Sequence, residues 1–266
     1  MTRAFGLIVV GDEILSGKRV DKHMPKVIEL LAARGLQLDW AEYVGDVPAR
    51  ITAALARAFA SGDIVFSTGG IGATPDDHTR QCAAAALGRP LVLHPEAELL
   101  IRERMQDTAR EQGTVYEPHR PDNVHRLNMG VFPVGAEIIR NPYNKIPGFS
   151  IDDVHFVPGF PVMAWPMIES VLDARYAQLF ALGAAAEKSV IVYGGMEATL
   201  TPLMEAIEKA HPGVKVFSLP SVDHPQHGRH IELGVKGSRD AMNAAYVDLL
   251  AGLRTFDVRL GPELVR

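Results

Sequence analysis

The chain has 266 residues, of which 47% are hydrophobic and 22% are charged, and its formal net charge is −5. This length suits one large or two smaller globular domains, and the acidic balance excludes the broad basic surface of a typical nucleic-acid-binding protein. A single cysteine, Cys82, excludes an internal disulfide, and no apolar run approaches the roughly 18 residues of a membrane span. We therefore expect a cytoplasmic protein whose partners are neither nucleic acid nor membranes.

The first third of the chain alternates predicted strands and helices. Continuous apolar runs at 4–10 and 63–68 are typical of strands buried on both faces, and residues 36–44 predict a strand between them. Each strand is followed by a helical pattern, at residues 21–35, 48–62 and 75–87. Helices of this length between strands predict right-handed βαβ crossovers and a mainly parallel sheet.

The middle of the chain is less regular. Its pattern predicts a helix at 95–112, strands at 136–141 and 154–157, and a helix at 161–172 with Pro166 in its first turns. The segment 115–135, rich in Pro, Asn and His, is expected to be a long excursion from the sheet.

A second pattern begins near residue 175. Strands are expected at 189–194, 214–219 and 229–237, and helices at 197–210 and 239–253. The sequence therefore predicts an α/β domain over residues 1–174 and a small α+β domain over residues 175–266.

Acids and glycines follow the predicted parallel strands at their carboxyl ends, which is where an open parallel sheet binds its ligands. The carboxylates expected on this rim of the sheet are Asp12, Glu13, Asp46, Asp76 and Asp77. Carboxylates gathered in one place repel one another unless a cation or the donors of a ligand lie between them. Mg²⁺ prefers a few carboxylates together with waters and substrate phosphates, so the rim suits this ion.

The glycine-rich segment 68–72, "TGGIG", has a matching use. Backbone N–H groups before a helix N-terminus form an anion cradle, although this segment is neither the dinucleotide fingerprint nor a Walker motif. Capping explains the acids without a ligand: Thr74 would be the N-cap of the next helix, and Asp76 and Asp77 would lie in its first turn. Asp46, shortly before Pro48, has the same alternative, but the gathering of acids on one rim favours a ligand site.

Three motifs together carry a resemblance to a known family. "VVGDEILSGKRVD" (9–21), "VGD" (44–46) and "TGGIGATPDDHTR" (68–80) resemble the molybdopterin-binding domain of molybdenum-cofactor (MoCF) biosynthesis, and most closely the competence- and damage-inducible protein A family. "NPYNKIPGF" (141–149), "PGFP" (158–161) and, more weakly, "VIVYGGMEATLTPLM" (190–204) extend the likeness over nearly the whole chain. Longer members carry an amidase domain, which we do not expect here.

The resemblance implies a three-layer α/β fold of molybdopterin-binding type and a small-molecule ligand, either molybdopterin or a nucleotide-like phosphate ester. It also implies a homo-oligomer. The activity that it implies is either that of a metal-dependent pyrophosphatase acting on ADP-ribose or that of an adenylyltransferase acting on molybdopterin. A module that binds these ligands without turnover is the alternative. Asp46 and Asp77 match the family's functional acids, which would be catalytic and hold a divalent metal, Mg²⁺. The expected ligand- and phosphate-binding residues are Gly11, Asp12, Glu13, Gly17, Thr68, Gly69, Gly70, Gly72, Thr74, Asp76, Lys145 and Gly159.

Several positions depart from the family pattern. His23 replaces an Asn, Ala73 replaces a Pro, Asn144-Lys145 replaces a Gly-Thr pair, and Met163 replaces a Glu. The last two changes are expected on the far wall of the pocket, where Lys145 could supply a point charge to phosphate. The substrate and catalysis itself depend on these positions.

The histidines form a separate question. His224, His227 and His230 are spaced for a zinc site, but Pro225 and Gly228 favour an exposed hairpin, with His230 on its polar face. His119 and His125 lie in the excursion, where the sequence leaves open a lid or a subunit contact.

Overall fold

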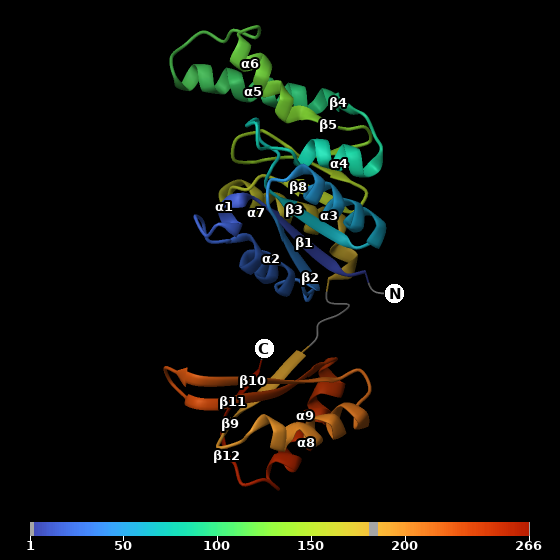
Figure 1. The fold of residues 1–266 in the computed structure, drawn as a ribbon, viewed down its shortest axis with the longest axis vertical. Helices are drawn as coiled ribbons and strands as arrows, with labels where there is room; N and C mark the ends of the chain where they lie inside the picture. The colour runs from blue at the N-terminus through green and yellow to red at the C-terminus, as the bar shows by residue number, and fades with distance from the viewer. Residues whose placement is uncertain (1–2, 181–185, 266) are drawn as a thin grey trace. The chain divides into compact units, whose positions relative to one another are not determined.

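The computed structural model describes residues 3–180 and 186–265. The chain divides into two compact units, Met1–Gln178 (unit 1) and Leu179–Arg266 (unit 2) (Figure 1). The boundary expected after residue 174 falls in the last turn of the helix α7 (Pro161–Arg175), just before this division. Among the described residues, no helix combines the length and the apolar character that crossing a bilayer requires.

Unit 1 is built on a mixed, mainly parallel sheet with the strand order β2-β1-β3-β8-β7-β6. The strands are β1 (Phe5–Val10), β2 (Trp40–Val44), β3 (Ile64–Thr68), β6 (Glu137–Ile139), β7 (Gly148–Ile151) and β8 (Val154–Val157). The pairs β1–β2, β1–β3 and β3–β8 are parallel, whereas β7 pairs antiparallel with both β6 and β8. The sequence did not predict β7, because its short run follows Pro147 and contains a glycine, which are turn signals.

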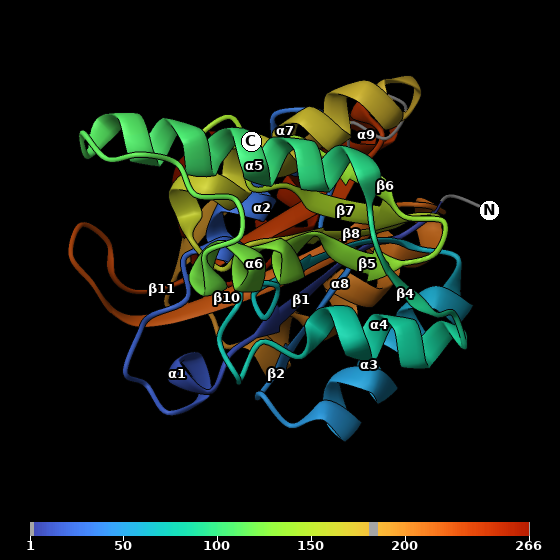
Figure 2. The ribbon, with the colours of Figure 1, turned by 90° about the horizontal axis from the view of Figure 1, so that it is seen from above.

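Helices cover both faces of this sheet. On one face α3 (Pro48–Ser61) packs beside α4 (Thr79–Leu87), and on the other α2 (His23–Ala32) packs beside α7 (Figures 1 and 2). All six residues of β1 are buried, and Ile8 packs in the same core cluster as Ile51 and Leu55 of α3. The helical layers on both faces of the sheet confirm the predicted three-layer α/β fold. They also explain why β1 is apolar along its whole length, because both of its faces are covered.

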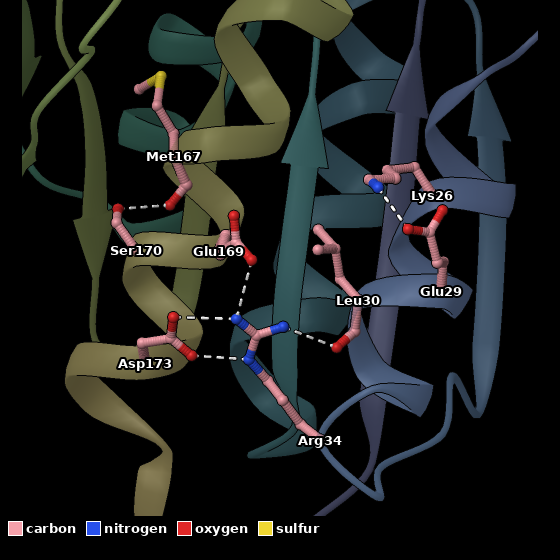
Figure 3. Close-up of polar contacts among 8 residues, drawn as sticks. All are labelled: Lys26, Glu29, Leu30, Arg34, Met167, Glu169, Ser170 and Asp173. Carbon is pink, nitrogen blue, oxygen red and sulfur yellow. Dashed lines mark hydrogen bonds and ion pairs between the residues drawn. The ribbon is translucent and has the colours of Figure 1, made fainter.

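Arg34 joins the two helices on the second face (Figure 3). Its Nε and Nη2 donate to the two carboxylate oxygens of Asp173 at 2.7 and 2.9 Å, and Nη2 also donates to Glu169 at 3.2 Å. Nη1 donates to the carbonyl of Leu30 at 2.9 Å, and only 11% of the Arg34 side chain is exposed. The guanidinium thus connects the end of α2 to the last turns of α7.

The excursion is more ordered than the sequence suggested. It follows α5 (Pro95–Glu111) and contains α6 (Pro121–Arg126), the 3₁₀ helix η1 (Leu127–Gly130) and β5 (Val131–Pro133), which pairs antiparallel with β4 (Leu91–Leu93). The carbonyl of Gly130 accepts from the N–H of His94, the residue before α5. The excursion therefore returns to the start of α5 instead of extending away from it.

Unit 2 is the small α+β domain that the sequence predicted. Its antiparallel sheet has the order β10-β11-β9-β12 and is packed by two helices. The elements are β9 (Ala186–Tyr193), α8 (Glu197–Ala210), β10 (Lys215–His224), β11 (Gly228–Gly237), α9 (Arg239–Leu253) and β12 (Arg259–Val265). The sequence did not predict β12, whose Gly261-Pro262 pair is atypical of a strand but is tolerated at this sheet edge.

Candidate functional site

The carboxyl ends of four parallel strands are joined directly at one rim of unit 1. The N–H of Gly11, which follows β1, donates to the carbonyl of Val44 at the end of β2 at 3.0 Å. The N–H of Gly69, which follows β3, donates to the carbonyl of Val157 at the end of β8, also at 3.0 Å. The loops that carry the expected site residues therefore start from fixed neighbouring points.

Asp12 and Asp46 hold two of these loops together. The N–H of Asp12 donates to Oδ2 of Asp46 at 2.8 Å, and the N–H of Asp46 donates to Oδ1 of Asp12 at 3.1 Å. Asp12 begins the short helix α1 (Asp12–Leu15). A side chain at position 45 would collide with Oδ1 of Asp12, which explains the glycine between β2 and Asp46.

The glycine-rich turn after β3 is held by the first residue of α4. Gly69 and Gly70 have φ values of 96° and 68°, which L-residues with side chains rarely adopt. Thr79 is fully buried; its hydroxyl donates to the carbonyl of Gly69 at 3.1 Å and its N–H to the carbonyl of Gly70 at 3.0 Å. The turn is thus tied to the helix that follows it.

The acids of this loop do not start the helix, which corrects the capping interpretation. The helix α4 begins at Thr79 rather than near Pro75, and its N-cap residue His78 makes no side-chain capping bond. Oδ2 of Asp77 instead accepts from the N–H of Thr74 at 2.8 Å and from its hydroxyl at 2.5 Å, which closes a separate turn. Asp46 does not cap α3 either, because its carboxylate bonds to Asp12.

A cavity of about 680 Å³, here called the rim cavity, opens where these loops meet. Its lining residues are Val10, Gly11, Glu13, Lys18, Arg19, Asp46, Gly69, Gly70, Ile71, Gly72, Ala73, Thr74, Asp76, Asp77, Pro158, Gly159 and Phe160. The expected acids Glu13, Asp46, Asp76 and Asp77 therefore face one space, together with three glycines of the turn.

The sequence did not predict two cationic residues of the rim cavity. Lys18 and Arg19 line it, and both side chains are exposed. The N–H of Arg19 donates to the carbonyl of Glu13 at 2.9 Å, which folds this segment back onto α1. The available signal was a pair of basic residues directly after Gly17, in the loop that follows a rim strand. With them the cavity has acidic and basic groups in one space.

Negative charge accumulates around Asp46. Burial raises the pKa of its carboxyl, the N–H of Asp12 opposes this, and the charges of Asp12, Glu13 and Asp76 raise it further. The neighbouring Thr74 side chain is the main cause that lowers the pKa of Asp76, although its hydroxyl hydrogen itself goes to Asp77. Over the described ranges, no three His, Cys, Asp or Glu side chains are arranged as a ready-made metal cage. Any cation here would therefore rely on fewer carboxylates, completed by water or a ligand's oxygens.

Four of the expected site residues do not line the rim cavity. Asp12 acts through Asp46, Gly17 lies on the exposed loop before Lys18, and Thr68 is fully buried with no partner for its hydroxyl. Lys145 points elsewhere: its Nζ lies 2.6 Å from Asp107 and 3.5 Å from Glu103, both on α5. The structure therefore does not bring Lys145 to the other site residues.

Of the departures from the family pattern, His23 contacts a loop of the rim cavity, whereas Asn144 and Met163 contact each other and do not line it. His23 is buried at the start of α2, and its Nε2 lies 3.0 Å from the carbonyl of Gly159. Because a carbonyl only accepts, Nε2 carries the proton. Nδ2 of Asn144 lies 3.5 Å from Sδ of Met163, so the Asn144 loop packs against the start of α7.

The three hairpin histidines of unit 2 cluster, with ring centroids 5.1 to 5.6 Å apart. His230 is buried rather than on an exposed polar face, because its ring packs beside His224 and His227 while its Nδ1 donates to the carbonyl of Gly228 at 2.9 Å. The described residues contain no metal-binding group of three here either.

Comparisons with known proteins identify the family of unit 1. Residues 6–178 match the family described as a probable molybdopterin binding domain. A protein of Aeropyrum pernix is 30% identical over 218 residues, which cover 80% of this chain and 78% of the relative. A CinA-like protein of Anaeromyxobacter dehalogenans is 34% identical over 160 residues, which cover 59% of this chain but only 37% of that longer relative.

A solved structure shows the same fold. The crystal structure of the protein CinA from Thermoplasma acidophilum superposes with a TM-score of 0.53 at 26% identity, and the match covers 65% of this chain and 97% of that chain. Apart from Phe5 at the start of β1, the family match spans the sheet, its helices and every rim loop of unit 1. The chain therefore belongs to the molybdopterin-binding (MoCF biosynthesis) domain family, with CinA-like proteins among its relatives.

Proposed function

We propose that the protein is a divalent-metal-dependent enzyme that cleaves or transfers the phosphate group of a nucleotide or pterin, such as ADP-ribose or molybdopterin, in the rim cavity. The observation that carries the proposal is the composition of this cavity. Asp46 and Asp77 from two loops share it with Lys18, Arg19 and the glycine-rich turn. A phosphate ester needs donors for its oxygens, and its reaction needs a cation and a positioned water or hydroxyl.

The residues fit a divalent metal. Carboxylate oxygens are hard donors of the kind that Mg²⁺ prefers. Burial and the charges of Asp12, Glu13 and Asp76 raise the pKa of Asp46, and a cation would relieve that repulsion. Asp46 and Asp77 would hold the ion, which would supply charge neutralisation at the reacting phosphate.

The chain's own residues have separable roles in this proposal. Lys18 and Arg19 attract the phosphates and hold them as cationic donors. Backbone N–H groups of the turn at Gly70 and Gly72 orient the phosphate oxygens, whereas the N–H of Gly69 is bonded to Val157 and shapes the turn. Thr74 holds the carboxylate of Asp77, and Asp12 holds that of Asp46, so both acids are fixed before a ligand arrives.

Calorimetric titration with ADP-ribose and with AMP, with and without Mg²⁺, tests the proposal when the same samples are assayed for AMP and ribose 5-phosphate. Wild-type protein is expected to bind and to cleave ADP-ribose only with the metal. Asp77→Asn keeps an acceptor for Thr74, so it should bind AMP but lose turnover. Asp257→Asn, an exposed acid of unit 2, is the matched control and should behave like wild type.

Metal-independent binding without any product would contradict the enzyme and identify a non-catalytic binding module. A protein that binds neither compound would leave molybdopterin as the ligand class to test. We also propose that the protein is a homo-oligomer. Sedimentation velocity of the purified protein measures its oligomeric state.

A further inference from the structure

The loop that carries Asp77 also lines a second cavity of about 430 Å³, which we call the rear cavity. Its lining residues are Ala73, Thr74, Pro75, Asp77, His78, Arg80, Gln81, Leu91, His125, Asn128 and Val131. Ala73, Thr74 and Asp77 also line the rim cavity, so the two spaces share one wall. A ligand with two different ends could occupy both.

Arg80 is the first sign that the rear cavity is a binding site. The residue is only 4% exposed, and its Nη1 and Nη2 donate to the backbone carbonyls of Asn128 and Gly72. Its Nε is buried without a hydrogen-bond partner. The charge of Asp77 offsets part of the cost of burying this cation, but the unused donor remains costly, and an electron-rich ligand group beside it would reduce that cost.

The excursion holds the rear cavity in a fixed form. Nε2 of His125 donates to the carbonyl of Ala73 at 3.0 Å, which requires the proton on Nε2. Nδ2 of Asn128 then donates to Nδ1 of His125 at 3.3 Å. This order leaves Oδ1 of Asn128, which lines the cavity, as an acceptor, and it bonds His125 to the loop that carries Asp77.

The lining suits a flat ring better than a second phosphate. Leu91, Val131 and Pro75 are apolar, and His78 and His125 contribute planar rings. The amides of Gln81 and Asn128 combine a donor with acceptors, which is the pattern that reads a ring nitrogen beside an amino group. The cationic donors proposed for the phosphates, Lys18 and Arg19, line the rim cavity instead.

We propose that the rear cavity binds the amino-substituted nitrogen heterocycle of the ligand whose phosphate lies in the rim cavity. The inference rests on the proposed function, because it divides one ligand between the two cavities. Adenine, guanine and pterin share this chemistry, and guanine and pterin share the same 2-amino-4-oxo edge. The loop 73–77 would then lie between the ring and the reacting phosphate.

Ring and phosphate can be tested separately. Calorimetry with AMP, GMP and 6-hydroxymethylpterin measures ring binding, and inorganic pyrophosphate with Mg²⁺ measures the rim cavity alone. Gln81→Ala should weaken the ring-containing ligand that the wild type prefers about tenfold and leave pyrophosphate affinity unchanged. Gln81→Trp, which fills the cavity from an exposed helical position, should abolish ring binding. Gln106→Ala, an exposed glutamine of α5, is the matched control.

The preferred probe identifies the ring: AMP alone indicates adenine, whereas GMP together with the pterin indicates the 2-amino-4-oxo edge. Unchanged affinity for all three probes in both Gln81 variants would overturn the inference, with the proposed function intact if pyrophosphate still binds. A wild-type protein that binds the pterin but not pyrophosphate would contradict the proposed function instead. In that case the pterin affinity of the Gln81 variants would still show whether the rear cavity binds the ring.

Discussion

Asp12 and Asp46 each accept a hydrogen bond from the other's backbone N–H, at 3.1 and 2.8 Å, although 34 residues separate them. This reciprocal pair joins the ends of β1 and β2 and turns Asp46 into the rim cavity, which Asp12 itself does not line. Asp12 is therefore a positioning residue for the acid that is proposed to hold a metal.

Substitution of Asp12 tests this relationship. Asp12→Ala removes the acceptor for the N–H of Asp46 and should weaken Mg²⁺ binding about tenfold, with a loss of about 1 kcal/mol of unfolding free energy. Asp12→Asn keeps Oδ1 as an acceptor and should retain most of the affinity. Calorimetric Mg²⁺ titrations of the two variants measure the difference, and equal affinities would show that the pair does not position Asp46.

Neutralisation of Lys18 and Arg19 tests the basic part of the cavity. The double variant Lys18→Gln/Arg19→Gln should bind pyrophosphate at least tenfold more weakly at low ionic strength. The difference in pyrophosphate affinity between wild type and this variant should narrow at higher salt concentration, because screening weakens interactions between exposed charges. Lys209→Gln/Lys215→Gln removes the same charge from exposed positions of unit 2 and serves as the control. The same loss in both double variants would indicate an effect of net charge alone.

His155 should make unit 1 sensitive to acid. The residue is fully buried between Ser150 and Tyr176, with 2.8 Å from Nδ1 to the serine hydroxyl and 2.6 Å from Nε2 to the tyrosine hydroxyl. Burial lowers the pKa of His155 to about 3. The unfolded chain takes up the proton below a pH of about 6.5, and the folded protein does so only near its lower pKa, so stability falls as the pH drops through this window.

The expected effect is a loss of about 2 kcal/mol between pH 7 and pH 5 from His155 alone. His155→Gln should remove this dependence, so the stability gap between wild type and variant should shrink by that amount at the lower pH. Urea unfolding followed by tryptophan fluorescence measures it, because both tryptophans, Trp40 and Trp165, belong to unit 1. Parallel pH profiles would show that His155 does not titrate differently on folding.

The contact between α2 and α7 gives a prediction for stability. Arg34→Ala removes the hydrogen bonds of its guanidinium to Leu30, Glu169 and Asp173 and should cost about 1–2 kcal/mol of unfolding free energy, limited by the solvent exposure of its acidic partners. Glu29→Ala breaks the exposed pair with Lys26 on the same helix and should cost less than about 0.5 kcal/mol. Equal losses in the two variants would contradict the structural role of Arg34.

Much of the fold could be predicted from the sequence because the signals are local. A buried strand such as 5–10 must be apolar throughout, and Gly62 ends its helix in the left-handed conformation that the pattern indicated. The order of strands and helices then places the acids on one rim, and the motifs around Asp12, Asp46 and Asp77 indicated the family.

The tertiary structure decided what each side chain does on that rim. A carboxylate beside a proline looks the same in sequence whether it caps a helix or closes a turn, and only the bond from Thr74 shows that Asp77 does the latter. Lys145 bonds to Asp107 on α5, and Lys18 lines the rim cavity, because chain segments far apart meet in space. Hydrogen bonds across such distances leave no local pattern, so the sequence determined which residues reach the rim and the folded structure determined which of them face the ligand.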